Sequence, residues 1–142
     1  MTANAVRPWW GRYLAIPFRE RGRSWRGCDC RGLALLVLEE ECGVHVPEPA
    51  ELYGSTDPRN GAALADFARA QAALWRPAAV EPFAVLSFAV AGRPVHVGVA
   101  IDAQTFLHAQ QGVGVRVAGL AEREPGETRW GERLLGAYRY AG

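Results

Sequence analysis

Apolar residues crowd together just after residue 30 and would cover almost every side of a helix. They are Leu33, Leu35, Leu36, Val37 and Leu38, and three glutamates and Gly43 follow. A helix that is apolar nearly all round is buried. Glycine is preferred just past a helix end, and Pro47 lies a few residues beyond. The pattern therefore predicts a buried helix that begins at Cys30 or Arg31 and ends at Cys42.

Two other segments carry the helical spacing of apolar residues. Large apolar side chains in Trp9–Phe18 predict a short helix that ends before Pro17, because the residue ahead of a proline avoids the α conformation. In Gly61–Arg76 the apolar residues recur close to one face and a proline follows, which predicts a second helix. The polar, glycine-punctuated residues 19–27 predict a loop.

After Pro77 the spacing between apolar residues shortens from that of a helix to that of a strand, and β-branched residues become common. Four short runs follow, at Phe83–Val90, Val95–Ile101, Thr105–Ala109 and Val113–Val117, with turn-forming residues between them. Runs this close in sequence can pair only as antiparallel hairpins. The tail predicts a helical turn at Arg129–Leu135 and a last strand at Ala137–Tyr140. Helices followed by an antiparallel meander predict one α+β domain over residues 1–142.

The composition narrows the function classes. With 142 residues, 49% hydrophobic and 22% charged, the chain is typical of a globular domain. Its net charge of +1 gives no overall field to attract nucleic acid or an anionic membrane. No apolar run approaches the ~20 residues of a membrane span, and the first ten residues lack the apolar core of a signal peptide. We therefore expect cytoplasmic synthesis, no membrane insertion and no nucleic-acid partner.

Three cysteines lie near the start of the chain. An odd number argues against a disulfide framework. A metal site formed by Cys28, Cys30, Cys42 and His45 is one alternative, although the Cys-x-Cys gap is tighter than in most structural zinc sites. Buried inert thiols or one catalytic thiol explain the cysteines better, so we expect neither a metal nor a cofactor.

Cys30 is the candidate nucleophile. It follows a glycine-containing loop and begins the apolar helix, where the positive helix end and free N–H groups favour the thiolate. A nucleophilic cysteine also needs a base, and the chain contains only three histidines.

Two of them, His96 and His108, lie on adjacent predicted strands. If residues 102–104 form a three-residue turn, paired residues have numbers that add to 206, so Gly98 lies opposite His108. His96 is then one diagonal step away on the same small-residue face, and the two imidazoles can meet. A two-residue turn would put them on opposite faces, and a strand histidine is commonly a core residue. The combination with Cys30 matches the cysteine–base–orienter arrangement of thiol acyl-transfer enzymes.

Several of these segments also resemble a known family. Leu14-Ala-Ile-Pro-Phe18, Gly22 and Gly27-Cys-Asp-Cys-Arg-Gly-Leu33 resemble the "LGxPY…GG…GFDCSGL" opening of the NlpC/P60 cell-wall cysteine peptidases. Val95–Ile101 is similar to that family's "HVGIYI" strand, and Phe106–Ala109 to the strand that carries its third catalytic residue. Gly112–Val115 and the ending from Trp130 to Arg139 are most similar to the phage-tail and gene-transfer-agent branch.

The resemblance implies a papain-like fold with Cys30 as nucleophile, His96 as general base and His108 as the orienting residue. It also implies a substrate-binding role for Asp29, on the amine end of the substrate, and for the neighbouring Arg31. Arg31 stands where the family commonly has Ser or Trp. Two other departures are Phe18 in place of a tyrosine and Glu81-Pro82 in place of Gly-Asp.

The implied function is a peptidase that cuts peptidoglycan stem peptides, between D-glutamate and the diamino acid. The resemblance further implies that a phage-like tail or gene transfer agent carries the protein, held by tail hub or tip proteins, into the periplasm or cell wall. The alternative is a structural or assembly component of the tail tip with little activity.

Overall fold

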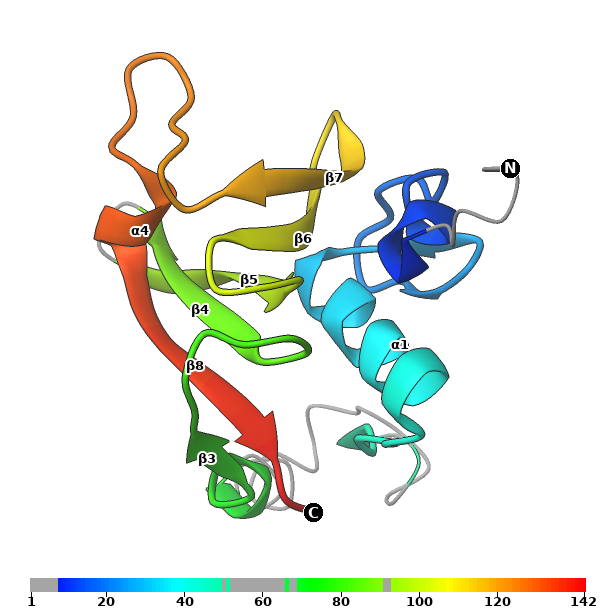
Figure 1. Ribbon diagram of the computed structural model, residues 1–142. Helices are drawn as coiled ribbons and strands as arrows, with labels where there is room; N and C mark the ends of the chain where they lie inside the picture. The colour runs from blue at the N-terminus through cyan, green and yellow to red at the C-terminus, as the bar shows by residue number, and fades with distance from the viewer. Residues whose placement is uncertain (1–7, 50, 52–65, 67–68, 91–92) are drawn as a thin grey trace, which may run out of the picture.

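The computed structural model describes residues 8–49, 51, 66, 69–90 and 93–142. Its elements are a 3-10 helix η2 (Trp9–Tyr13), helices α1 (Cys30–Cys42) and α4 (Trp130–Arg133), and strands β1 (Arg23–Ser24), β2 (Gly27–Cys28), β3 (Trp75–Pro77), β4 (Val85–Val90), β5 (Arg93–Ala100), β6 (Thr105–Gln110), β7 (Gly114–Gly119) and β8 (Leu134–Tyr140). Figure 1 shows α1 lying against one side of a curved antiparallel sheet, with α4 at the other side. The predicted α+β arrangement is confirmed.

Helix α1 has the predicted bounds and both of its ends are capped. The Asp29 side chain accepts a hydrogen bond from the Gly32 backbone N–H at 2.7 Å, which satisfies one of the free donors of the first turn. Gly43 adopts the left-handed conformation at φ 68°, and its N–H donates to the Glu39 carbonyl. These caps fix Cys30 as the first residue of the helix.

The large sheet has the strand order β3-β8-β4-β5-β6-β7. Its consecutive strands β4 to β7 form the predicted meander, and the last strand, β8, pairs antiparallel with both β4 and β3. The predicted helix over Gly61–Arg76 lies mostly outside the described residues. Its predicted end at Arg76 is wrong, because β3 pairs there with β8 across a long sequence separation that local periodicity does not reveal.

Two N-terminal predictions need smaller corrections. The predicted helix at Trp9–Phe18 is a 3-10 helix that already ends at Tyr13. The predicted loop 19–27 contains a short antiparallel pair, with Arg23 opposite Cys28 and Ser24 opposite Gly27.

This loop is pressed against the first turn of α1. A Cβ atom on Gly32 would overlap the backbone carbonyl of Gly22, so only glycine permits the approach.

The sheet separates two apolar clusters. On one side Leu33 and Val37 of α1 pack against Val99 of β5 and Leu107 of β6. On the other side the cluster contains Phe88, Phe106 and Trp130, which are all at most 4% exposed. Alternate residues of β5 and β6 therefore point into different clusters, as strand geometry requires.

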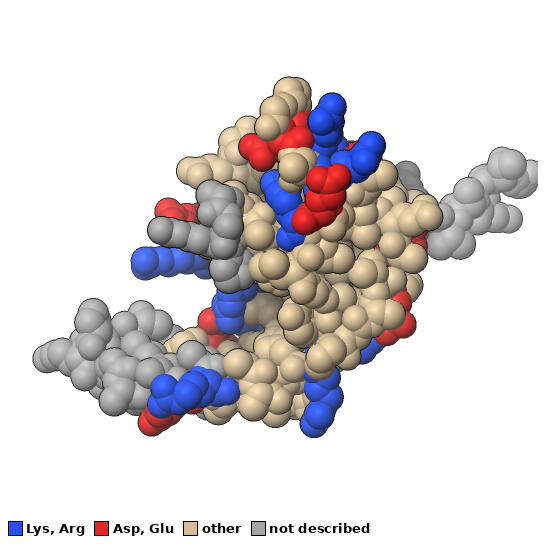
Figure 2. Space-filling model, turned by 90° about the vertical axis from the view of Figure 1, so that its left-hand side faces the viewer, with Lys and Arg blue, Asp and Glu red and all other residues tan. Residues whose placement is uncertain are grey.

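Charged side chains of both signs gather at the top of Figure 2, over the segment that precedes α4 in Figure 1. This face therefore shows mixed charge rather than a surface of one sign, consistent with the net charge of +1. Among the described helices, none has the length and apolar character needed to cross a membrane.

Candidate active site

The turn between β5 and β6 sets the register of the two histidine strands. The Ile101 N–H donates to the Thr105 carbonyl at 2.9 Å. Inside the turn, an Asp102 carboxylate oxygen accepts from the backbone N–H groups of Gln104 and Thr105, each at 2.8 Å. The turn thus has the three predicted residues, and the recorded pairs, Val99 with Leu107 and Ala100 with Phe106, follow the predicted sum of 206.

The two imidazoles meet directly. Nε2 of His96 lies 2.8 Å from Nδ1 of His108, and the rings are nearly perpendicular at 81°. His108 is fully buried. A Cβ on Gly98 would lie 2.8 Å from the Phe106 ring, so glycine leaves the space that this ring occupies beside the histidine pair.

Cys30 and His96 line one hollow of about 370 Å³. Its lining comprises Phe18, Cys30, Val90, His96, Ala109, Gln110, Gln111, Glu124, Glu127, Trp130 and Arg133. His108 lies behind His96, away from this lining. The fold thus places Cys30 and His96 on the walls of one hollow, with His108 in contact with His96. Phe18 reaches the hollow without the hydroxyl that a tyrosine would supply.

Burial is the largest cause of the pKa shifts of Cys30, His96 and His108. It raises the pKa of the Cys30 thiol, which backbone hydrogen bonds, chiefly from Val97, offset only in part. It lowers the pKa of His96 to about 4, with a further contribution from the charge of Arg133. It lowers the pKa of His108 to about 3, with His96 as the next cause. The start of a helix favours the thiolate, whereas burial of the sulfur raises the pKa of Cys30 in the free protein.

The predicted substrate-binding residues lie outside this hollow. One Asp29 carboxylate oxygen caps α1, and the other accepts from the Arg21 backbone N–H at 2.9 Å. Arg31 forms an ion pair with Glu48 at 2.8 Å. Both residues line another hollow of about 440 Å³ beside the N-terminal loop. Their roles in substrate binding stay predictions.

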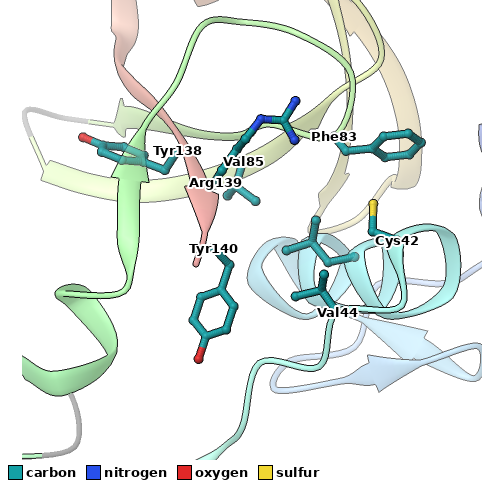
Figure 3. Close-up of a pocket in the computed structure, with 8 residues that line it drawn as sticks. Cys42, Val44, Phe83, Val85, Tyr138, Arg139 and Tyr140 are labelled. Carbon is teal, nitrogen blue, oxygen red and sulfur yellow. The ribbon is translucent and has the colours of Figure 1, made fainter. Parts of the chain in front are cut away.

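The remaining cysteines do not join the site. Cys28 is buried in the core and its thiol donates to the Ser24 carbonyl at 3.1 Å, as a packing role requires. Cys42 is exposed at the end of α1, so it is not one of the buried thiols that the sequence favoured. Figure 3 shows Cys42 beside a small pocket of about 90 Å³, near Phe83. Across the described ranges, no group of three or more His, Cys, Asp or Glu side chains could hold a metal ion.

Among the lining residues that sequence reasoning missed, Trp130 and Arg133 lie nearest the histidine pair. The Trp130 ring lies 5.3 Å from the His96 ring and 5.1 Å from the His108 ring, between centroids. The guanidinium carbon of Arg133 lies 3.9 Å from the Trp130 ring. Their spacing of three residues on a helical turn signals a shared face, but it does not reveal that this face packs on the histidines.

Comparison with known proteins identifies the relatives of this arrangement. A sequence model described as the NlpC/P60 family matches residues 15–139. No curated protein matches the chain.

The solved structures that are similar include two of NlpC/P60 proteins. One is a protein similar to a lipoprotein of the NLP/P60 family from Staphylococcus aureus subsp. aureus Mu50, with 21% identity and a TM-score of 0.57. The match covers 92% of this chain but only 38% of the staphylococcal protein. The other is the NlpC/p60 domain of the peptidoglycan hydrolase SagA, with 22% identity, a TM-score of 0.48, and coverage of 75% of this chain and 80% of that domain.

The family match spans nearly the whole chain, and the predicted papain-like α+β fold is confirmed. The chain belongs to the NlpC/P60 family.

Proposed function

We propose that this protein is a cysteine peptidase that hydrolyses amide bonds in peptidoglycan stem peptides. The observation that carries the proposal is the contact of 2.8 Å between His96 and His108 behind a hollow that Cys30 also lines. A thiol, a base and a group that orients the base are the parts that thiol acyl transfer needs. Membership of the NlpC/P60 family supports a cell-wall substrate.

The hydrogen bond between the histidines determines which nitrogen of each ring donates a hydrogen bond and which accepts one. Because Nε2 of His96 is held by His108, Nδ1 is left to accept the proton of Cys30. Nε2 then carries a hydrogen and donates it to Nδ1 of His108. His108 consequently has its own hydrogen on Nε2, a buried atom with no hydrogen-bond partner among the described residues. The Phe106 and Trp130 rings enclose His108 at centroid distances of 4.9 and 5.1 Å, and an N–H can donate weakly to an aromatic face.

The chemical steps follow from these positions. Cys30 passes its proton to Nδ1 of His96 as the sulfur attacks the amide carbonyl, forming a carbon–sulfur bond and an oxyanion. His96 returns the proton to the departing amine as the carbon–nitrogen bond breaks, which leaves a thioester on Cys30. Water then attacks the thioester and gives its proton to His96. The carbon–sulfur bond then breaks, the peptide acid departs, and His96 returns its proton to the sulfur, which restores the thiol.

The start of α1 can hold the oxyanion. The backbone N–H groups of Cys30 and Arg31 lie close enough to the sulfur to lower its pKa, whereas the Gly32 N–H is already bonded to Asp29. Two N–H donors beside the reacting sulfur suit the negative charge that develops on the carbonyl oxygen.

The proposal extends to the substrate bond and the setting. We assign the bond between D-glutamate and the diamino acid, with Asp29 and Arg31 on the substrate-binding side. We place the protein on a phage-like tail or gene transfer agent, held by hub or tip proteins and acting in the periplasm or cell wall. The resemblance of Gly112–Val115 and of the segment from Trp130 to Arg139 to that branch supports this setting.

Digestion of purified muropeptides, followed by mass spectrometry, tests the proposal. The wild-type protein should release products of one defined amide cleavage. Cys30→Ala should release none while it keeps the wild-type melting temperature. Cys28→Ala is the matched control, because it also removes a thiol near the start of α1 but should retain activity. Products from Cys30→Ala, or loss of activity only in Cys28→Ala, would contradict the assigned nucleophile.

A further inference from the structure

Arg133 is half-buried, and two of its three side-chain nitrogens have no hydrogen-bond partner among the described residues. Its Nε and Nη2 atoms are buried, and neither makes a hydrogen bond within the part of the chain that the structure describes. The contact that holds the side chain is the ring of Trp130, 3.9 Å from the guanidinium carbon. A buried N–H donor without a partner costs a protein free energy, because it has lost its hydrogen bonds to water. An anion that binds here would meet this need.

The position of Arg133 puts that anion beside the reacting atoms. Arg133 lines the same hollow as Cys30 and His96. Its charge also contributes to the low pKa of His96 and of His108, so the guanidinium is close to both rings. A ligand of Arg133 therefore lies next to the bond that Cys30 attacks.

The other charged residues of the hollow limit what the anion can be. Glu124 and Glu127 line it as well, and a Glu124 oxygen accepts a hydrogen bond from the Gln110 side chain at 2.6 Å. Two carboxylates near one arginine disfavour a dianion such as phosphate. A single carboxylate suits the planar fork of the guanidinium, which can donate two parallel hydrogen bonds to it.

We infer that Arg133 binds a free carboxylate of the substrate peptide, within one residue of the scissile amide. The inference rests on the proposed function and names a specificity contact for it. A glutamate joined through its side-chain carboxyl group keeps its α-carboxylate free, and the diamino acid on the other side of the bond supplies a second free carboxylate. Either carboxylate would neutralise Arg133, and this would remove one cause of the low pKa of His96 and make it a stronger base when substrate is bound.

The test compares three synthetic peptides that contain the γ-D-glutamyl–diamino acid bond. One keeps both carboxylates, one has the glutamyl α-carboxylate converted to an amide, and one has the diamino acid carboxylate converted to an amide. For one of the two amides, the wild-type kcat/KM should fall by about 10- to 100-fold, as expected for loss of a charge-assisted pair. The peptide that loses activity identifies which carboxylate Arg133 holds.

The same experiment with variants separates this contact from general damage. Arg133→Gln should reduce kcat/KM for the peptide with both carboxylates by a similar factor. It should leave kcat/KM for the affected amide peptide nearly unchanged, so that the preference between the two peptides disappears. Arg133→Lys should keep part of the preference because it retains the charge without the fork. Arg129→Gln is the matched control, an exposed arginine next to the same helical turn, and it should keep the full preference.

Binding provides a readout that does not depend on turnover. In the Cys30→Ala background, calorimetry should show weaker binding of the affected amide than of the free peptide, and Arg133→Gln should remove the difference. Equal cleavage and binding of all three peptides, or a preference that survives Arg133→Gln, would overturn the role of Arg133 while the peptidase stands. If the wild-type protein cleaved none of the three peptides, both the proposed function and this inference would be refuted.

Discussion

In the free protein, Cys30 should react with alkylating agents as an ordinary neutral thiol. Burial raises its pKa above the 9.0 of an unperturbed cysteine and holds the pKa of His96 at about 4. Both shifts oppose the thiolate–imidazolium pair, so the free protein should hold Cys30 as the neutral thiol and His96 as the neutral imidazole.

The assay is the rate of alkylation by iodoacetamide from about pH 5 to about pH 10, because only the thiolate reacts. A Cys42→Ala background removes the exposed thiol, and mass spectrometry of the Cys30 peptide locates the label. The rate should rise with pH across the whole range and show no plateau below neutral pH. His96→Gln should leave the profile nearly unchanged, because a neutral imidazole lends the sulfur no charge.

The contrary result is well defined. A rate plateau between about pH 5 and about pH 7 that disappears in His96→Gln would show a preformed ion pair. Burial would then not control the protonation of the site, and the proton transfer to His96 would precede substrate binding.

Three further outcomes are expected. His96→Ala should lose nearly all peptidase activity. His108→Gln should keep a residual kcat/KM, because a glutamine oxygen can still accept the hydrogen bond that orients His96. An equal loss of activity in both variants would contradict the separate roles of the two histidines. The unfolding free energy in urea should fall as the pH drops from about 6.5 towards about 3, since the unfolded chain then binds protons that folded His96 (pKa about 4) and His108 (pKa about 3) exclude, and His108→Gln should reduce this dependence. Gly32→Ala should lower the unfolding free energy by more than about 3 kcal/mol, because its Cβ would overlap the backbone carbonyl of Gly22. An unchanged denaturation midpoint would show that the loop over residues 19–27 moves aside at no cost in stability.

Local sequence signals were sufficient for the parts of the site that lie on neighbouring elements. Gly43 and the apolar run determined α1 and therefore the place of Cys30. The three-residue turn at 102–104 determined the β5–β6 register and therefore the meeting of His96 with His108. In each case a residue with a special backbone or turn preference lies within a few positions of the feature that it controls.

The features that depend on distant pairing could not be predicted in this way. Trp75–Pro77 follows an apolar helical pattern, yet it pairs with residues 138–140 as a strand. Trp130 and Arg133 reach the hollow because β8 returns the chain beside β4. The pKa of Cys30 depends on burial by several elements together, which its position at a helix start does not reveal.

The position of β8 has a consequence for the order of folding. Strands β4 to β7 follow one another along the chain and can form hairpins by closing short loops. Strand β3 pairs, among the described strands, with β8, and β8 is the last in sequence. We therefore expect the meander to fold early and β3 to join late, by closing a loop of more than fifty residues. A cut ahead of Leu134 would release two strands instead of one and leave β4 as an unprotected sheet edge, a common starting point for aggregation.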